Sequence, residues 1–366
     1  MKIALVTLTR GKVSGGFRKY LDHLVPLLRA QSGVEVEVFV PAQMAGAGER
    51  SWPERDELRR FRVLKQRVAE IEPDVVFIPT ARTLRVGLVP VVMMVRNMEP
   101  LEVPFGGNTI LEGFKNIARA TAARSACRDA DRVIAVSRHV HRFLTERWRV
   151  PADRVGMVYH GVDPASGDVE PPAAANAIAG RRFLFTAGSI RPARGLEDVI
   201  RAMSSVPEGV DLMIAGSVDR GAEHYEAAMR KLAGELGVSS RIVWAGQLDA
   251  RAMAWCFRNA EAFVMTSRAE ACPNVVLEAL TQGSLSISTT HPPMPEFFED
   301  AAVYYRERDS GSLAARIMEI LAVPVDERHR RKEAARARAA LYPWAATARA
   351  TIEELRLAMG AKLRHN

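Results

Sequence analysis

The chain has 366 residues, of which 48% are hydrophobic, and a chain of this size usually forms more than one hydrophobic core, so two domains are expected. Its 51 Lys and Arg against 43 Asp and Glu give a net charge of +8, which favours anionic partners, although a general abundance of Arg would give the same sign. Three widely separated cysteines and the lack of any apolar run near about 20 residues exclude a disulfide framework, a cysteine zinc site and a membrane-spanning helix.

Short β-rich runs alternate with helical stretches along the first half of the chain. Strands are predicted at Ile3–Leu8, Val34–Val40, Val75–Pro79, Val91–Val95 and Val133–Ser137. Such an alternation is typical of a parallel, doubly wound sheet. The first residues form a predicted strand and lack the long apolar region and cleavage site of a signal peptide, so a cytoplasmic location is expected.

The segment from Ala165 to Gly180 is rich in Ala, Pro, Gly and acidic residues and has no periodic apolar pattern, which is typical of a linker. The strand pattern then restarts, with strands predicted at Phe183–Thr186, Leu212–Ala215, Ile242–Ala245, Ala262–Thr266 and Leu285–Ser288. Beyond Asp326 the chain is helical, with a break at Tyr342-Pro343. The predicted organisation is a first domain over 1–163, a linker over 164–181, a second domain over 182–341 and a final helix over 342–366.

Two carboxylates follow the fourth predicted strand of the second half. Ligands of parallel α/β sheets bind at the carboxyl ends of strands, so chemistry is expected in such loops. Pro273 favours a helix start, which places Glu270 just before the helix and Glu278 about one turn inside it. Carboxylates there can accept hydrogen bonds from the vicinal hydroxyls of a sugar, and the amides at the helix start attract phosphate. Alternatively, Glu270 only caps the helix and Glu278 pairs with an Arg.

A basic loop runs from Gly188 to Gly195 and precedes a predicted helix at Leu196. Two guanidinium groups in this loop, those of Arg191 and Arg194, suit a diphosphate, although a solvated basic loop would look the same. A second glycine loop, at Gly15 and Gly16, follows the first strand. It lacks the G-x-G-x-x-G spacing of dinucleotide sites, so it is either a phosphate loop or only a turn.

These motifs together resemble those of the retaining glycosyltransferases of family 4. The run E-A-C-P-N-x-x-L-E-A at Glu270–Ala279 is similar to one variant of their Glu-x7-Glu signature. DRVIAVS at Asp131–Ser137, HGVD at His160–Asp163 and GSIRPARG at Gly188–Gly195 extend the resemblance over most of the chain. It implies an α/β fold of GT-B type: two Rossmann-like doubly wound domains that face a cleft, with a C-terminal helix that crosses back to the N-terminal domain.

The resemblance also implies roles for individual residues. Glu278 would bind the donor ribose, Glu270 would contact the donor sugar, and the Gly15-Gly16 loop would close over the donor phosphates. The implied catalytic residues are Arg191, Arg194 and Glu270. The implied donor-binding residues are Gly15, Gly16, Gly188, Ser189, Ala271, Cys272, Asn274, Val275 and Glu278.

Three positions differ from the family pattern or have two interpretations. The family usually carries Arg at the position of Ser189, and Arg191 is the candidate to replace it. Asn97 stands where many members have a His that faces the reacting sugar, so its role there would be hydrogen bonding to donor or acceptor sugar. Ser137 is the second candidate for such a contact, and it suits a helix N-cap equally well.

The implied reaction is transfer of a hexose from a nucleoside diphosphate sugar to a hydroxyl of a saccharide, lipid-linked or small-molecule acceptor, with retention of configuration. Polysaccharide or glycolipid biosynthesis at the cell surface is the expected context, and no cofactor and no metal are expected. Asp129-Ala130-Asp131 mimics a metal-binding motif but lies at a helix end, without further oxygen ligands. A non-hydrolysing nucleotide-sugar epimerase and a binding protein without turnover are the alternatives.

Two segments, Glu54–Val68 and Thr109–Arg128, are predicted to be helical and are rich in Arg. Basic helix faces can hold a protein on anionic lipid, so the inner face of the plasma membrane is a further candidate partner. The alternative is an ordinary solvated face on each helix. Nucleic acid is not expected as a partner.

Overall fold

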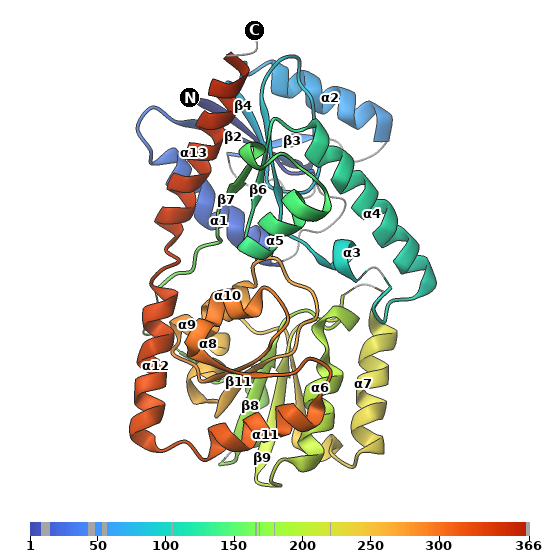
Figure 1. Cartoon of the computed structure of the whole chain (residues 1–366), viewed down its shortest axis with the longest axis vertical. Helices are drawn as coiled ribbons and strands as arrows, with labels where there is room; N and C mark the ends of the chain where they lie inside the picture. The colour runs from blue at the N-terminus through green and yellow to red at the C-terminus, as the bar shows by residue number, and fades with distance from the viewer. Residues whose placement is uncertain are drawn as a thin grey trace. The chain divides into compact units, whose positions relative to one another are not determined.

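The computed structural model describes residues 1–8, 15–42, 48–52, 57–103, 105–164, 167, 169–178, 180–219 and 221–363. The chain divides into two compact units, shown in Figure 1. Unit 1 consists of Met1–Leu101, Lys115–Gly161 and Trp344–Asn366, and unit 2 consists of Glu102–Phe114 and Val162–Pro343. Each unit is built around one parallel sheet of its own.

Unit 1 has a seven-stranded parallel sheet in the order β3-β2-β1-β4-β5-β6-β7. Its strands are β1 (Lys2–Val6), β2 (Glu35–Pro41), β3 (Arg50–Trp52), β4 (Val75–Ile78), β5 (Val91–Val95), β6 (Arg132–Ala135) and β7 (Val155–Met157). Its helices are α1 (Gly15–Arg29), α2 (Glu57–Ala69), α5 (Arg138–Arg142) and α13 (Trp344–Leu363). α3 (Glu99–Glu102) and α4 (Ile110–Asp129) each have residues assigned to both units. On the sheet, α1 and α13 lie on one side, while α2 and α4 lie on the other (Figure 1).

The last helix of the chain belongs to unit 1. α13 packs against α1 and against β4, β5 and β6. Its buried positions include Thr351, Ile352, Leu355 and Ala358, which recur at helical spacing on one face. Glu354 on the same helix forms an ion pair with Arg132 of β6 at 2.6 Å. The final helix therefore returns to the first domain, as the resemblance implies.

Unit 2 has a six-stranded parallel sheet in the order β10-β9-β8-β11-β12-β13. Its strands are β8 (Arg182–Ala187), β9 (Val210–Ala215), β10 (Ile242–Gly246), β11 (Ala262–Met265), β12 (Ser286–Thr289) and β13 (Ala302–Tyr305). Its helices are α6 (Leu196–Ala202), α7 (Glu223–Glu235), α8 (Ala250–Asn259), α9 (Asn274–Thr281), α10 (Met294–Phe298), α11 (Ser310–Leu321) and α12 (Val325–Ala339). α6 packs against α7 and α11, while α9 packs against α8, α10 and α12. The predicted fold class, two Rossmann-like doubly wound domains, is confirmed.

Some elements differ from the sequence prediction. β3, β7 and β13 were not predicted; β3 and β7 have only three residues each, which is too few to show a pattern. The predicted linker contains a 3-10 helix at Ala173–Ile178, whose last side chain, that of Ile178, is buried within unit 2. Unit 2 also includes Glu102–Phe114, a segment placed in the first domain by the sequence. Among the residues described here, no helix is long and apolar enough to cross a membrane.

Candidate functional site

The strand order of unit 2 reverses between two neighbouring strands, β8 and β11. From β8 the chain continues outward to β9 and β10, and from β11 it continues in the opposite direction to β12 and β13. The carboxyl ends of strands at such a reversal form the crevice where open α/β sheets bind ligands. The loop after β8 contains Arg191 and Arg194, and the loop after β11 contains Glu270. Both loops in which the sequence predicts chemistry therefore start at the same point of the sheet.

Arg194 joins these two loops through its side chain. Its Nη1 donates to Ser267 Oγ at 2.8 Å and to Glu270 Oε1 at 3.1 Å. Only 7% of Arg194 is exposed, and a buried guanidinium needs a charged partner and hydrogen bonds to offset its lost hydration. The structure thus brings together two predicted catalytic residues, a cation and a carboxylate, as one ion pair.

The two loops are also joined by hydrogen bonds to backbone carbonyls. The Arg268 amide donates to the carbonyl of Ala193 at 2.8 Å, and Thr266 Oγ1 donates to the carbonyl of Arg194 at 2.7 Å. Gly195, the N-cap of α6, has a φ of +67°, and a Cβ there would lie 2.5 Å from the Thr266 carbonyl oxygen. Glycine is therefore required by both the backbone conformation and the close approach.

Gly188 makes room for the Arg194 side chain. It has a φ of +131°, and a Cβ at this position would overlap the Arg194 guanidinium. Its carbonyl also lies against Gly216, where a Cβ would collide with it. The predicted donor-binding residue Gly188 is thus needed for the position of Arg194, and Ser189 follows it at a partly exposed position.

Arg191 pairs with an acidic residue on the β9 side of β8, whereas Arg194 pairs with one on the β11 side. Arg191 Nη1 contacts Asp219 Oδ2 at 3.3 Å, and Asp219 follows β9. Because β9 and β11 flank β8 on opposite sides, Arg191 and Arg194 pair with acids from different neighbouring strands. The two arginines of the predicted diphosphate loop thus form ion pairs with two different carboxylates, those of Asp219 and Glu270.

A buried network that was not predicted from the sequence lies behind Arg194. Arg268 Nη2 donates to Asp198 Oδ1 at 3.1 Å and lies 3.4 Å from Glu197 Oε2. Asp198 Oδ2 also accepts a hydrogen bond from Tyr305 Oη at 3.0 Å. Tyr225 Oη donates to Glu197 at 2.8 Å and accepts from the Leu196 amide at 2.9 Å. This network fixes the first turn of α6 to the loop after β11.

Burial shifts the pKa of two members of this network, Asp198 and Tyr305. Burial raises the pKa of Asp198 above its usual value, while the charge of Arg268 and the hydrogen bonds from Tyr305 and the Arg308 amide act in the opposite direction. Burial also raises the pKa of Tyr305, and the neighbouring Asp198 charge adds to that effect. The sequence signals of this network were Arg268, two residues before Glu270, and the acidic pair Glu197-Asp198, which is separated from the basic loop by Leu196.

α9 exposes a narrow face at its first turns. It begins at Asn274 with Pro273 as N-cap, close to the prediction. Asn274, Val275 and Glu278 are partly exposed, whereas the positions between them are buried, as are Ala271 and Cys272 before the helix. Three of the predicted donor-binding residues therefore share one face, because positions three and four apart are neighbours on a helix.

The predicted residues of unit 1 lie after β1, β5 and β6. Gly15 and Gly16 were predicted in a loop but form the first turn of α1, and residues 9–14 lie outside the described residues. Arg96, directly after β5, donates to the Gly16 carbonyl at 3.4 Å, and its guanidinium lies 4.5 Å from the ring centroid of Phe17. Arg96 was not predicted from the sequence.

Asn97 and Ser137 have local hydrogen bonds. Asn97 is exposed, and its Oδ1 accepts from the Glu99 amide at 3.1 Å. Ser137 is fully buried, and its Oγ accepts from the Val140 amide at 3.2 Å as the N-cap of α5. The N-cap interpretation of Ser137 is therefore correct, and contact of either residue with a sugar stays a prediction.

The acidic motif before β6 has a structural partner. Asp131 Oδ2 accepts from Arg85 Nη1 at 2.6 Å and from the Val91 amide at 2.7 Å. Within the described ranges, no three His, Cys, Asp or Glu side chains are grouped so that they could hold a metal ion.

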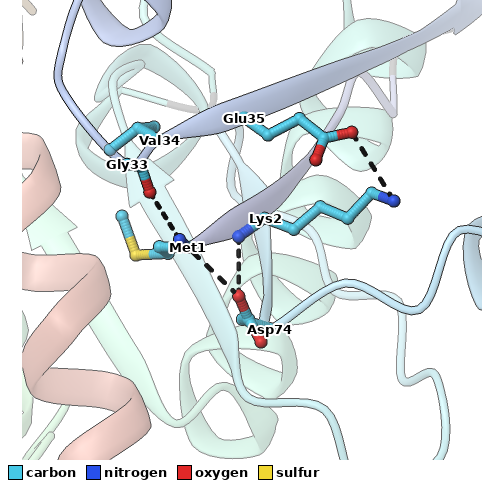
Figure 2. Close-up of a pocket in the computed structure, with 6 residues that line it drawn as sticks. All are labelled: Met1, Lys2, Gly33, Val34, Glu35 and Asp74. Carbon is cyan, nitrogen blue, oxygen red and sulfur yellow. Dashed lines mark hydrogen bonds and ion pairs between the residues drawn. The ribbon is translucent and has the colours of Figure 1, made fainter.

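A pocket in unit 1, shown in Figure 2, lies at the amino ends of its strands, whereas the predicted residues follow their carboxyl ends. It is lined by residues at the amino ends of β1, β2 and β4. Asp74 accepts from the Lys2 amide at 2.6 Å, and the Lys2 side chain lies 3.5 Å from Glu35. Since these charges pair with one another and the predicted residues lie at the carboxyl ends of strands, this pocket is not the candidate site.

Two family descriptions match the chain. Residues 14–166 match "Glycosyltransferase Family 4", and residues 172–338 match "Glycosyl transferases group 1". The chain belongs to the glycosyltransferases. The first match falls on the predicted N-terminal domain of this glycosyltransferase and the second on its predicted C-terminal domain.

Curated relatives of this glycosyltransferase match part of its length. It is 26% identical over 200 residues to the D-inositol 3-phosphate glycosyltransferase of Mycolicibacterium gilvum, a match over 52% of this chain and 45% of that protein. The corresponding protein of Mycobacterium bovis is 27% identical over 220 residues, 55% of this chain and 46% of that protein. The chain thus spans about half the length of the curated relatives that it matches.

Solved structures match the whole glycosyltransferase. Anabaena HepE in complex with UDP-glucose superposes with a TM-score of 0.78 at 17% identity, over 97% of this chain and 99% of that chain. A glycosyltransferase from Rickettsia africae superposes with a TM-score of 0.75 at 14% identity, over 100% of this chain and 99% of that chain. At these identities the likeness shows the GT-B type of fold.

Proposed function

We propose that this glycosyltransferase is a retaining hexosyltransferase that moves a sugar from a nucleoside diphosphate sugar to an acceptor hydroxyl without a metal. The observation that supports this proposal is the buried Arg194, held between Ser267 and Glu270 at the strand reversal of unit 2. A preorganised cation at such a point can stabilise a diphosphate, and a carboxylate beside it can accept hydrogen bonds from sugar hydroxyls.

In the proposed reaction the bond between the anomeric carbon and the diphosphate breaks, and a bond to the acceptor oxygen forms on the same face of the sugar. The acceptor proton passes to the departing phosphate, so no protein nucleophile is required. Negative charge grows on the diphosphate as the bond breaks, and Arg194 acts on that charge. Glu270 holds sugar hydroxyls, and Glu278, on the exposed face of α9, accepts hydrogen bonds from the donor ribose.

For the acceptor, we propose a saccharide, lipid-linked or small-molecule hydroxyl in cell-surface polysaccharide or glycolipid biosynthesis. The glycosylation of an inositol phosphate by the mycobacterial relatives supports a polyol or sugar acceptor in general terms. The acceptor would bind to the first domain, where Asn97 follows β5. An epimerase with the same two-domain fold is the second candidate, because it would use the same donor site without an acceptor.

The test is product analysis with a panel of nucleoside diphosphate sugars and a mixture of sugar, polyol and lipid-linked acceptors. The proposal expects release of nucleoside diphosphate in equal amount to a glycosylated acceptor whose new linkage has the anomeric configuration of the donor. Conversion of a nucleotide sugar in the absence of acceptor would instead identify an epimerase. Calorimetric donor binding with no product under any acceptor would identify a binding protein.

A further inference from the structure

The first turn of α6, Leu196–Asp198, directly follows Gly195 and is held by side chains from three other elements of unit 2. Tyr225 Oη of α7 accepts a hydrogen bond from the first amide of this turn at 2.9 Å. Tyr305 Oη of β13 donates to the Asp198 carboxylate at 3.0 Å, and Arg268, after β11, donates to the same carboxylate at 3.1 Å. The turn is therefore fixed relative to α7, β13 and the loop after β11.

Arg268 also contacts the main chain on both sides of Arg194. The Arg268 amide donates to the Ala193 carbonyl at 2.8 Å. A Cβ placed on Gly195 would lie 3.1 Å from Arg268 Nε, so the arginine side chain lies against the residue that follows Arg194. Because Gly195 has no side chain, Arg268 can pass along this backbone and reach Asp198. One residue thus links the loop that contains Arg194 with the helix that follows it.

Arg268 and Asp198 form a buried ion pair, with side chains that are 15% and 5% exposed. Burial of two charges costs hydration, and such a pair is often no more stabilising than well-packed apolar side chains. A guanidinium nevertheless fixes geometry, because its hydrogen bonds are directional. The same Nη2 also lies 3.4 Å from Glu197 Oε2, so two successive carboxylates of the α6 turn are tied to one group. The pair is therefore better suited to fix this turn than to stabilise unit 2 in general.

We propose that Arg268 is a positioning residue, which through its pair with Asp198 and its contacts with the loop holds Arg194 at the place where the diphosphate departs. This inference rests on the proposed function for the role of Arg194, whereas the positioning itself is a property of unit 2. Arg194 acts on charge that grows as the glycosidic bond breaks, so a displaced guanidinium should lower turnover more than donor affinity. Arg268 acts through Arg194 and not on the substrate.

The first experiment separates turnover from KM. Arg268→Gln should lower turnover at saturating donor about tenfold or more and change the donor KM less than about threefold. Arg268→Lys keeps the charge and should exceed the Gln variant in turnover about threefold or more. The matched control is Arg241→Gln, which removes another partly buried arginine of unit 2, one that donates to the carbonyls of Met203, Val206 and Val210 around the start of β9. This control should lose stability and keep parental turnover.

The decisive comparison repeats Arg268→Gln in the Arg194→Ala background. If Arg268 acts through Arg194, the residual turnover should change less than about twofold. The same loss in both backgrounds would show a general structural role and overturn the proposal. The paired variant Arg268→Gln with Asp198→Asn leaves no unpaired charge at position 198, so it should be more stable in urea than Arg268→Gln alone while its turnover stays low. Parental turnover in the paired variant would also overturn the proposal.

Hydrogen exchange followed by mass spectrometry tests the positioning without any turnover. Peptides over 188–198 should exchange about tenfold faster in Arg268→Gln than in the parent, and at the parental rate in Arg241→Gln. Tyr305→Phe removes only one hydrogen bond to Asp198, and about threefold faster exchange is expected of this milder variant. Unchanged exchange in both Arg268→Gln and Tyr305→Phe would overturn the proposal. A parent that transfers no sugar would instead refute the proposed function, and the exchange rates would still decide whether Arg268 holds this loop.

Discussion

Replacement of Arg194 is the most direct test of the candidate site. The residue is 7% exposed, and its guanidinium holds Ser267 at 2.8 Å and Glu270 at 3.1 Å. Arg194→Ala removes a hydrogen-bonded cation and leaves a partly buried carboxylate without this partner. Losses of this kind cost about 2–4 kcal/mol of unfolding free energy, less than for a fully buried pair because Glu270 retains some contact with water.

The catalytic effect should be larger than the loss of donor affinity. Removing one preorganised charge stabiliser lowers turnover by about 10²-fold or more, because the diphosphate gains charge as the glycosidic bond breaks. Arg194→Lys keeps a positive charge and should retain much of the turnover, since a point charge can serve a phosphate. The double variant Arg194→Ala with Glu270→Gln should be less destabilised than the sum of the single variants by about 1–3 kcal/mol.

The assay is nucleotide release at saturating donor, with turnover and KM separated, alongside urea unfolding of each variant. Circular dichroism establishes that the Ala variant is folded at the assay temperature. A folded Arg194→Ala protein with turnover within about threefold of the parent would remove Arg194 from catalysis, because a lost charge stabiliser should have a far larger effect. Additive stabilities of the Arg194 and Glu270 variants would show that the ion pair has no energetic weight.

Three further predictions concern neighbouring residues. Arg191→Ala should change turnover much less than Arg194→Ala, because Arg191 pairs with Asp219 on the β9 side; an equal loss would show that it also reaches the diphosphate. Glu278→Gln should weaken binding of nucleoside diphosphate, measured by calorimetry, about tenfold or more, and parental affinity would contradict its contact with the ribose. Burial raises the pKa of Asp198, so the native state holds its proton more tightly than the unfolded state does. The unfolding free energy of the parent relative to Asp198→Asn should therefore rise as the pH falls from neutral towards the ordinary Asp value of 3.8, and urea unfolding at several pH values would detect a change of the opposite sign.

The local sequence was sufficient to predict an element where a single local feature, such as a continuous apolar run or a proline, determined its position. β5 was predicted to the residue, because VVMMV is a continuous apolar run buried on both faces. The start of α9 was predicted closely from Pro273. In α13 the buried face follows Thr351, Ile352, Leu355 and Ala358, whereas the apolar Leu357 is 42% exposed, so hydrophobic residue type alone does not identify that face.

Sheet order and tertiary contacts could not be predicted in the same way. Arg191 and Arg194 are close in the sequence, and nothing local indicates that they pair with residues after different strands. Their separation follows from the position of β8 between β9 and β11, which depends on the whole sheet. The contact of Arg268 with Asp198 likewise joins the loop after β11 to the first turn of α6, 70 residues apart, and only the folded sheet brings them together.

The first turns of α6 and α9, the two helices of the candidate site, differ in charge. Glu197 and Asp198 lie in the first turn of α6, where their negative charges neutralise the positive end of the helix dipole. The positive charge of Arg268 is paired with both of these carboxylates. The first turn of α9 has no acidic residue, and its N-cap residue, Pro273, provides no side-chain hydrogen bond to the helix amides. We therefore expect a diphosphate at the start of α9, where the sequence also predicts amides that attract phosphate, in preference to the start of α6. Arg194 is the arginine of that loop whose side chain reaches the α9 side, through Glu270, and this is why its replacement should affect turnover more than that of Arg191.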